Sequence, residues 1–216
     1  RIADLARARG VPVVRPRFDG PGNALRVRHG GRVSPLLSLR LAGDHQHENA
    51  AVAVGALFAI DEASLAIVDA ARAVDARWPG RAETSWGRPR FVFDVGHNPN
   101  GARALAAYLE QCERGCDPWT LVFGAMKDKD HASMLAALRP RMNHVILTSP
   151  KLGRAAEPKR MAKPGDLIVP DVADAIEEAM KRSMPEGFVI VTGSTFVVAE
   201  ARAKVLGIEN DPPIAF

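Results

Sequence analysis

Between residues 81 and 206, short apolar runs alternate with longer segments whose apolar positions recur at helical spacing. The runs are apolar throughout rather than at every second position, which is typical of parallel strands covered on both faces. This alternation predicts an α/β fold, a Rossmann-like, doubly wound domain with a mostly parallel sheet of about six strands. The predicted strands lie within 81–86, 90–95, 119–124, 143–149, 166–170 and 187–193, and the predicted helices at 100–112, 129–139, 155–162, 171–182 and 195–206.

A different pattern precedes residue 80. Residues 24–41 predict a β-hairpin around a Gly-Gly turn, and Ala-rich helices are expected at 45–60 and 61–74. The Pro79-Gly80 step then interrupts the helical pattern, and such a step is a strong turn signal. We therefore expect a domain boundary there. The two expected domains are residues 1–80 and 81–216.

The composition is that of a globular protein, with 47% apolar and 25% charged residues among 216. No apolar stretch reaches the roughly 18 residues of a membrane span, so no membrane partner is expected. The formal net charge of +4 favours anionic ligands. Nucleic acid is disfavoured, because one Tyr, three Trp and scattered basic residues offer no stacking platform or basic stripe. The chain opens on Arg1 and not on an initiator Met, which suggests a start inside a longer protein.

The cysteines and histidines do not predict a metal site. Cys112 and Cys116 lie four apart on an expected helix, where a disulfide is sterically awkward, and they lack a matching His pair for zinc. These features favour a reduced, cytoplasmic protein. The histidines without metal-ligand spacing are His45, His47, His131 and His144, and no metal ligand is assigned.

The stretch after the run at 90–95 combines groups that suit a nucleotide. Asp94 ends the apolar run, Gly96 allows a sharp turn, and Asn98 can cap the next helix. A helix start favours phosphate, because its free N–H groups and its dipole point outward. Asp94 suits ribose hydroxyls, and His97 offers a donor to phosphate or sugar. The spacing alone fits a capped turn with a solvent-facing His equally well.

Two further strand ends carry polar side chains. Lys127 and Lys129 follow a strand that ends at Phe123, so they are expected to be exposed at its carboxyl end. Asp128 or Asp130 can cap the following helix. A solvated charge cluster is the competing interpretation. Ser194 follows the last apolar run, and as a cap of the last helix it contributes about 1 kcal/mol without any ligand.

Several motifs together resemble one family. They are "LAGDHQHENAAVAVGAL", "WPGR", "DVGHNPNGARAL", "VFGAMKDKD" and "VIVTGSTFVVAEAR". In this order they resemble the His-Gln-x-x-Asn-Ala helix start, the Pro-Gly-Arg linker, the Asp-x-x-His-Asn-Pro signature, the Asp-Lys-Asp loop and the final Gly-Ser turn of folylpolyglutamate synthase/dihydrofolate synthase, within the Mur ligase superfamily. The resemblance implies an ATP-dependent ligase that joins L-glutamate to a folate or dihydropteroate carboxylate through an acyl phosphate.

The resemblance also implies the organisation of the chain. Such enzymes carry a P-loop domain, yet no Gly-Lys dipeptide occurs in this sequence, so a P-loop is not part of it. Residues 1–80 would be the C-terminal remnant of the central, P-loop-type ATP-binding domain, and residues 81–216 the C-terminal glutamate ligase domain. The chain alone is then not expected to be competent. The Mg2+ ligands are expected mostly upstream of this chain, and the implied enzyme is a monomer.

Carried over by matching positions, the resemblance implies roles for individual residues. No catalytic residue is assigned. Asn49 would contact adenine, Arg81 would reach the phosphates, Asp94 and His97 would hold the ribose and phosphate side of ATP, Lys127 or Lys129 would hold the carboxylate of the incoming amino acid, and Ser194 would line the amino-acid pocket. Each residue also has an ordinary explanation, as a polar helix residue, a solvated charge or a helix cap.

Other interpretations stay open. The chain could be part of another Mur-type ligase that acts on a cell-wall precursor, or a non-catalytic nucleotide-binding or interaction module. A nicotinamide oxidoreductase is disfavoured, because the "GPGNAL" stretch at Gly20 precedes a strand and lacks the third Gly of the dinucleotide fingerprint. The basic segment 151–163 is interpreted as a solvated face, although its Arg154-Ala155 step resembles one in the family and could meet a glutamate tail.

Overall fold

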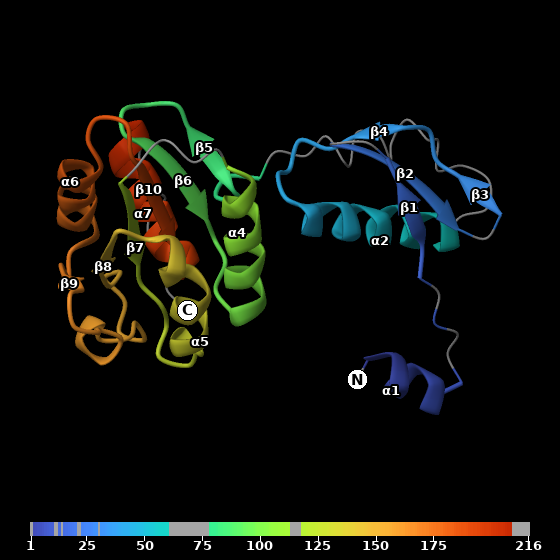
Figure 1. Cartoon of the computed structure of the whole chain (residues 1–216). Coiled ribbons are helices and arrows are strands. Elements are labelled where there is room, and N and C mark those ends of the chain that lie inside the picture. Colours follow the sequence, from blue (N-terminus) through green and yellow to red (C-terminus); the bar gives the residue numbers. More distant parts are fainter. Residues whose placement is uncertain are drawn as a thin grey trace. The chain divides into compact units, whose positions relative to one another are not determined.

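The computed structural model describes residues 2–10, 13, 15–20, 23–29, 31–60, 78–112 and 118–208. The chain divides into two compact units, unit 1 from Arg1 to Arg77 and unit 2 from Trp78 to Phe216. Figure 1 shows both, with unit 1 in blue and cyan and unit 2 from green to red. The helix expected at 61–74 lies outside the described residues, as do Gly30 and Cys116.

Unit 1 contains a small antiparallel sheet with one long helix packed on it. Strand β2 pairs antiparallel with β1, β3 and β4, and its pairing with β3 confirms the predicted hairpin. Leu25, Val27 and Leu37 of the sheet pack with Ala51 and Val54 of α2 in a buried core. The described elements are α1 (Ile2–Ala8), β1 (Arg17–Asp19), β2 (Ala24–His29), β3 (Arg32–Val33), β4 (Leu37–Ser38) and α2 (Asp44–Ile60).

Unit 2 is built on a six-stranded sheet with strand order β5-β6-β10-β7-β8-β9. All neighbouring strands are parallel except β5, which pairs antiparallel with β6 at the edge. The predicted α/β fold with a mostly parallel sheet is therefore confirmed. The elements are β5 (Glu83–Ser85), β6 (Arg90–Asp94), α4 (Pro99–Gln111), β7 (Trp119–Phe123), α5 (His131–Leu138), η1 (Arg139–Arg141), β8 (His144–Leu147), η2 (Pro158–Arg160), β9 (Leu167–Ile168), α6 (Val172–Ser183), β10 (Phe188–Thr192) and α7 (Thr195–Leu206).

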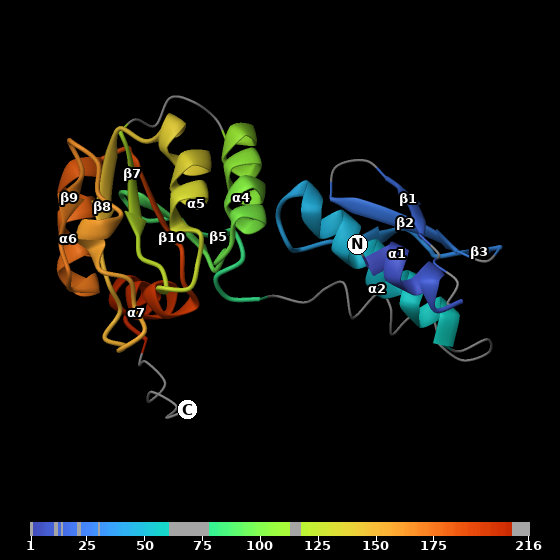
Figure 2. The ribbon, with the colours of Figure 1, turned by 90° about the horizontal axis from the view of Figure 1, so that it is seen from below.

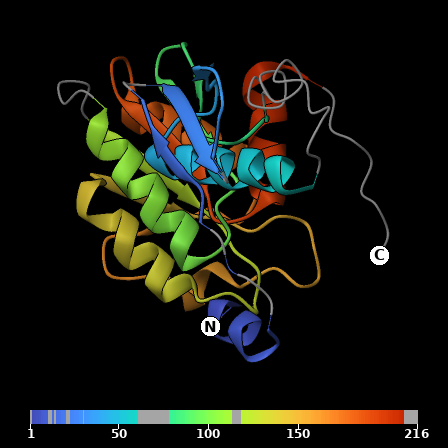
Figure 3. The same cartoon turned by 90° about the vertical axis from the view of Figure 1, so that its right-hand side faces the viewer.

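Helices cover both faces of this sheet. Figure 2 shows α4 and α5 on one side of the strands and α6 and α7 on the other, and Figure 3 shows α4 and α5 lying side by side. The central strand β10 contributes alternate residues to the two cores: Phe188 and Ile190 pack towards α4 and α5, while Val189 and Val191 pack towards α6 and α7. Burial on both faces explains why the central strands β10 and β7 are apolar at four of their five positions.

The connections of β6 and β10 define where a ligand is expected. Strand β10 lies between β6 and β7. Helix α4 follows β6 and covers one face, whereas α7 follows β10 and covers the other. The chain therefore leaves two adjacent strands in opposite directions at their carboxyl ends. In open α/β sheets ligands bind in the crevice at such a point.

One predicted helix is wrong. Residues 155–162 contain only the short 3₁₀ helix η2. The residues before it are extended because Ala155 forms a β-bridge with Met126, and the Ala156 amide donates to the Ala125 carbonyl over 2.8 Å. These contacts bind the segment after β8 to the loop after β7. Within the described ranges, no helix has the length and apolar character needed to cross a bilayer.

Candidate functional site

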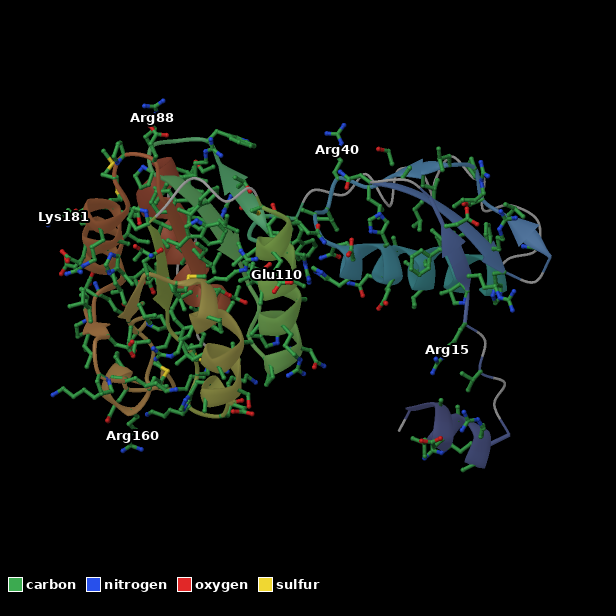
Figure 4. The ribbon with its side chains drawn as sticks, in the orientation of Figure 1. Arg15, Arg40, Arg88, Glu110, Arg160 and Lys181 are labelled. Atoms are coloured by element: carbon green, nitrogen blue, oxygen red, sulfur yellow. The ribbon has the colours of Figure 1, made fainter. Side chains whose placement is uncertain are left out.

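The polar side chains of interest in unit 2 follow the carboxyl ends of β6, β7 and β10. Figure 4 labels one residue at each end of unit 2. Arg88, before β6, lies at one end, and Arg160, in η2 after β8, lies at the opposite end. The parallel strands β6 to β10 run towards the end that carries Arg160, and β5 runs the other way.

The loop after β6 starts helix α4 as the sequence predicts. The Asn98 side chain accepts a hydrogen bond from the Gly101 amide at 2.9 Å, and Pro99 occupies the first helical turn. Gly96 is required for space rather than for a left-handed backbone. A Cβ atom there would lie 2.8 Å from Asp94 Oδ1 and 3.3 Å from the Gly101 carbonyl carbon. The loop therefore packs directly on the helix start.

Asp94 holds two backbone segments together. Its Oδ1 accepts from the Gly96 amide at 2.8 Å, and its Oδ2 accepts from the Ala82 amide at 3.0 Å. Ala82 has a φ of +45°, a conformation that L-residues rarely adopt. Such a residue persists only where its surroundings impose it. The Asp94 carboxylate therefore fixes both its own loop and the turn at residues 78–83, called the linker turn below.

The linker turn is fixed at further points. The Val95 amide donates to the Gly80 carbonyl at 2.7 Å, and the Gly80 amide donates to Glu83 Oε2 at 2.7 Å. Gly80 has a φ of +73°, and a Cβ atom there would lie 2.9 Å from the Val95 side chain and 3.0 Å from that of Val198. Only glycine satisfies both the backbone conformation and this close packing.

Arg81 is presented by this turn. Its side chain is exposed, and its guanidinium makes no hydrogen bond or ion pair with any residue that the structure describes. The exposed ring of His97 lies on the neighbouring loop, with Nδ1 3.2 Å from the Val95 carbonyl oxygen. Because a carbonyl only accepts, Nδ1 carries the proton of this bond. The outward Nε2 then accepts from a hydroxyl when the ring is neutral and donates to an anion when it is protonated.

The loop after β7 carries the two candidate lysines. Asp130, not Asp128, caps α5, accepting from the Ser133 amide at 3.0 Å. Lys127 is exposed, and its Nζ donates to the Gly153 carbonyl at 2.9 Å. Lys129 Nζ lies 2.8 Å from Asp128 Oδ2. The hydrogen bond from Lys129 lowers the pKa of the Asp128 carboxyl.

The loop after β10 is tightly packed. Ser194 is buried, and its Oγ accepts from the Phe196 amide at 3.2 Å, so the hydroxyl caps α7. The Gly193 amide donates to the Gly96 carbonyl at 3.2 Å, which ties this loop to the one after β6. A Cβ atom on Gly193, whose φ is +105°, would lie 2.7 Å from the Gly124 carbonyl oxygen. The three loops therefore meet at Gly96, Gly124 and Gly193.

Asn49 belongs to unit 1. Its side-chain amide donates to Gln46 Oε1 at 3.2 Å, and the buried Gln46 also contacts the His45 ring at 2.9 Å. A hollow of about 420 Å³ lies near the start of α2, but Asn49 does not line it. The lining residues are Phe18, Asp19, Gly20, Ala24, Asp44, His47 and Glu48.

The candidate residues of unit 2 thus fall on three adjoining loops. Arg81, Asp94 and His97 lie on or beside the loop after β6, Lys127 and Lys129 on the loop after β7, and Ser194 on the loop after β10. No sequence pattern indicated that Glu83 and Arg202 shape this region. Glu83 pairs with Arg202 of α7 over 2.6 Å, and the Arg154 guanidinium lies over the Phe196 ring at 5.5 Å. Arg154 therefore packs beside the start of α7 while its side chain stays exposed, as the interpretation of a solvated face expects.

The described residues contain no group of three or more His, Cys, Asp or Glu side chains that could hold a metal ion. No Mg2+ ligand is therefore assigned to them.

Comparison with protein families matches residues 80–195 to the family described as "Mur ligase, glutamate ligase domain". The matched range lies within unit 2. A protein of Haloferax volcanii named "Probable bifunctional folylpolyglutamate synthase/dihydropteroate synthase" is 34% identical over 201 residues, which are 82% of this chain and 23% of that protein. The folylpolyglutamate synthase of Lacticaseibacillus casei is 30% identical over 186 residues, 82% of this chain and 42% of that protein.

Solved structures give the same picture. The Escherichia coli enzyme FolC in complex with DHPP and ADP matches with a TM-score of 0.81 and 26% identity, over 95% of this chain and 50% of that chain. A bifunctional folylpolyglutamate synthase/dihydrofolate synthase with Mn, AMPPNP and L-glutamate bound matches with a TM-score of 0.78 and 28% identity, over 95% of this chain and 50% of that chain. The chain spans less than half the length of these curated relatives and half that of the solved ones.

Proposed function

We propose that this chain, which belongs to the Mur ligase family through its glutamate ligase domain, is the glutamate-adding part of a folylpolyglutamate synthase/dihydrofolate synthase. The complete enzyme would use ATP to join L-glutamate to a folate or dihydropteroate carboxylate. The observation that carries this proposal is the position of three residues at the carboxyl end of β6. Asp94 ends the strand, His97 lies on the loop that follows, and Arg81 lies on the linker turn that Asp94 holds. At this point the chain leaves the adjacent strands β6 and β10 towards opposite faces of the sheet.

Each of these residues has a separate task in the proposal. The exposed guanidinium of Arg81 suits phosphate, because its planar fork donates two parallel hydrogen bonds. His97 presents Nε2 outward to the ribose or phosphate, since Nδ1 is engaged by the Val95 carbonyl. Asp94 keeps both groups in place through its bonds to the Ala82 and Gly96 amides.

The phosphate cradle itself is proposed to come from the half of the solved relatives that this chain does not span. The chain has no Gly-Lys dipeptide and hence no P-loop. Asn49 of unit 1 is proposed to contact the adenine. Mg2+, where bound, neutralises phosphate charge, and no step is assigned to a metal ligand of this chain.

L-glutamate is proposed to bind at the loops after β7 and β10. Lys127 is the better candidate of the two lysines. Among the described residues its ammonium group contacts only the neutral Gly153 carbonyl, whereas Lys129 is paired with Asp128. Ser194 would orient the amino acid through the start of α7. In the ligation, a substrate carboxylate oxygen attacks the terminal phosphorus of ATP and ADP leaves. The glutamate amine then attacks the acyl carbon and phosphate leaves.

A ligation assay on the complete enzyme that contains this chain tests the proposal. ADP release is measured with L-glutamate and one acceptor at a time: dihydropteroate, a reduced folate, or a UDP-linked cell-wall precursor. The proposal expects ADP release only when L-glutamate and a pterin-containing acceptor are both present. ADP release with the wall precursor but with neither pterin-containing acceptor would assign the chain to another Mur-type ligase. Nucleotide binding without ligation of any acceptor would favour a non-catalytic module.

A further inference from the structure

Helix α7, the last helix among the described residues, is joined to the linker turn by one carboxylate. Arg202 of α7 donates to Glu83 twice, from Nε to Oε2 at 2.6 Å and from Nη2 to Oε1 at 2.8 Å. Glu83 Oε2 also accepts from the Gly80 amide at 2.7 Å. A side chain far along the sequence therefore holds the backbone of the turn.

The ion pair of Arg202 with Glu83 is less exposed than an ordinary surface ion pair. The side chains of Arg202 and Glu83 are only 17% and 29% exposed, against 77% and 65% for the surface pair of Arg160 with Glu157. Burial by itself raises the pKa of Glu83, but hydrogen bonds from Arg202 and from the Gly80 amide outweigh it, and the pKa lies below its usual value. A bidentate Arg–carboxylate pair fixes orientation as well as distance.

Arg81 lies between the anchored residues. On one side Gly80 is held by Glu83, and on the other Ala82 is held by Asp94. Because both neighbours are fixed, the direction in which the Arg81 side chain leaves the backbone is also fixed. Its guanidinium nevertheless stays exposed.

We propose that Arg202 is a positioning residue for nucleotide binding. By holding Glu83, it keeps the linker turn in the conformation that presents Arg81, so that the turn does not have to be ordered when the nucleotide binds. The inference rests on the proposed function, in which Arg81 binds phosphate. Arg202 itself does not touch the nucleotide.

A purely structural role makes a different prediction. If Arg202 only stabilises unit 2, its removal lowers the resistance to unfolding but leaves the nucleotide affinity of the folded protein unchanged. The pair of Arg139 with Asp166 provides a matched control. It is also bidentate, with both distances at 2.6 Å, and its side chains are 17% and 5% exposed. It joins η1 to the residue before β9, away from the linker turn.

The experiment compares Arg202→Ala, Arg202→Lys and Arg139→Ala in the complete enzyme. The dissociation constant for AMPPNP and the hydrogen exchange of the amides in the linker turn are measured below the unfolding midpoint of each variant. Arg202→Ala is expected to weaken AMPPNP binding about tenfold and to speed exchange at Gly80 and Ala82 by a similar factor. For Arg202→Lys, both quantities are expected to lie between those of the wild type and of Arg202→Ala, because an ammonium group keeps the charge but not the two parallel hydrogen bonds of a guanidinium group. Arg139→Ala is expected to leave both quantities within about twofold.

Double variants separate this inference from the proposed function. If Arg202 acts through Arg81, then Arg81→Ala with Arg202→Ala binds AMPPNP no more weakly than Arg81→Ala alone. Additive losses, or unchanged affinity in both Arg202 variants, would overturn the positioning role while leaving the proposed function intact. Unchanged affinity in Arg81→Ala would overturn the phosphate assignment itself, and with it the inference.

Discussion

Replacing Asp94 by Ala should loosen the linker turn as well as the nucleotide site. The carboxylate accepts from the Ala82 amide at 3.0 Å and from the Gly96 amide at 2.8 Å. Each such hydrogen bond contributes about 1 kcal/mol net to stability. The variant should therefore lower the free energy of opening the turn by about 2 kcal/mol, which is roughly a 30-fold change in the opening equilibrium. Ala82 makes the loss local, because its φ of +45° is strained and relaxes once the acceptor is gone.

The assay combines hydrogen exchange with urea unfolding. All three tryptophans lie in unit 2, at positions 78, 86 and 119, so tryptophan fluorescence reports the unfolding of that unit alone. Asp94→Asn keeps one acceptor oxygen and should lose about half as much as Asp94→Ala. Asp130→Ala removes the cap of α5, so it should cost about 1 kcal/mol without speeding exchange at Ala82. Equal Ala82 exchange in wild type and Asp94→Ala would refute the reasoning.

Three further predictions concern packing, pH and the amino acid. Gly193→Ala should destabilise unit 2 by about 1–3 kcal/mol in urea unfolding, since its Cβ would lie 2.7 Å from the Gly124 carbonyl oxygen. Gly153→Ala should not, because its Cβ would meet no atom of the described residues within 4 Å. Burial raises the pKa of Asp166, but hydrogen bonds from Arg139 and the Lys163 amide outweigh it and lower that pKa. This stabilisation is full above the unfolded pKa of about 3.9 and is lost as pH falls through the folded pKa. Between about pH 6 and pH 2, the urea midpoint of Asp166→Asn should therefore fall less steeply with falling pH than that of the wild type. In steady-state kinetics of the complete enzyme, Lys127→Ala should raise the KM for L-glutamate about tenfold or more, and Lys129→Ala should change it less; the reverse order would favour Lys129.

Local signals in the sequence predicted the loop after β6 well. Asn98 caps α4 and Pro99 occupies its first turn, because both preferences depend only on adjacent backbone groups. The apolar runs likewise predicted the mostly parallel sheet. The reason given for Gly96 was incomplete, since its place depends on the approach of Asp94 and Gly101 rather than on a sharp turn.

Features that depend on distant contacts were missed. Glu83 and Arg202 are 119 positions apart, and no local pattern marks them as partners. The helix expected at 155–162 does not form because Ala155 bridges Met126 on another loop. Tertiary pairing overrides local helix propensity there. Asp94 was expected to hold a ligand, and that role stays a prediction. Its contact with the Gly96 amide is local, whereas its contact with the Ala82 amide forms only once the linker turn is folded against β6.

The most direct test of the account is the affinity of the complete enzyme for AMPPNP with and without the His97 imidazole. If the carboxyl end of β6 holds the nucleotide, His97→Ala should weaken binding about tenfold, whereas Arg88→Ala, at the opposite end of unit 2 in Figure 4, should leave it unchanged. Equal affinities for wild type and His97→Ala, in a variant that unfolds at the wild-type urea midpoint, would contradict it.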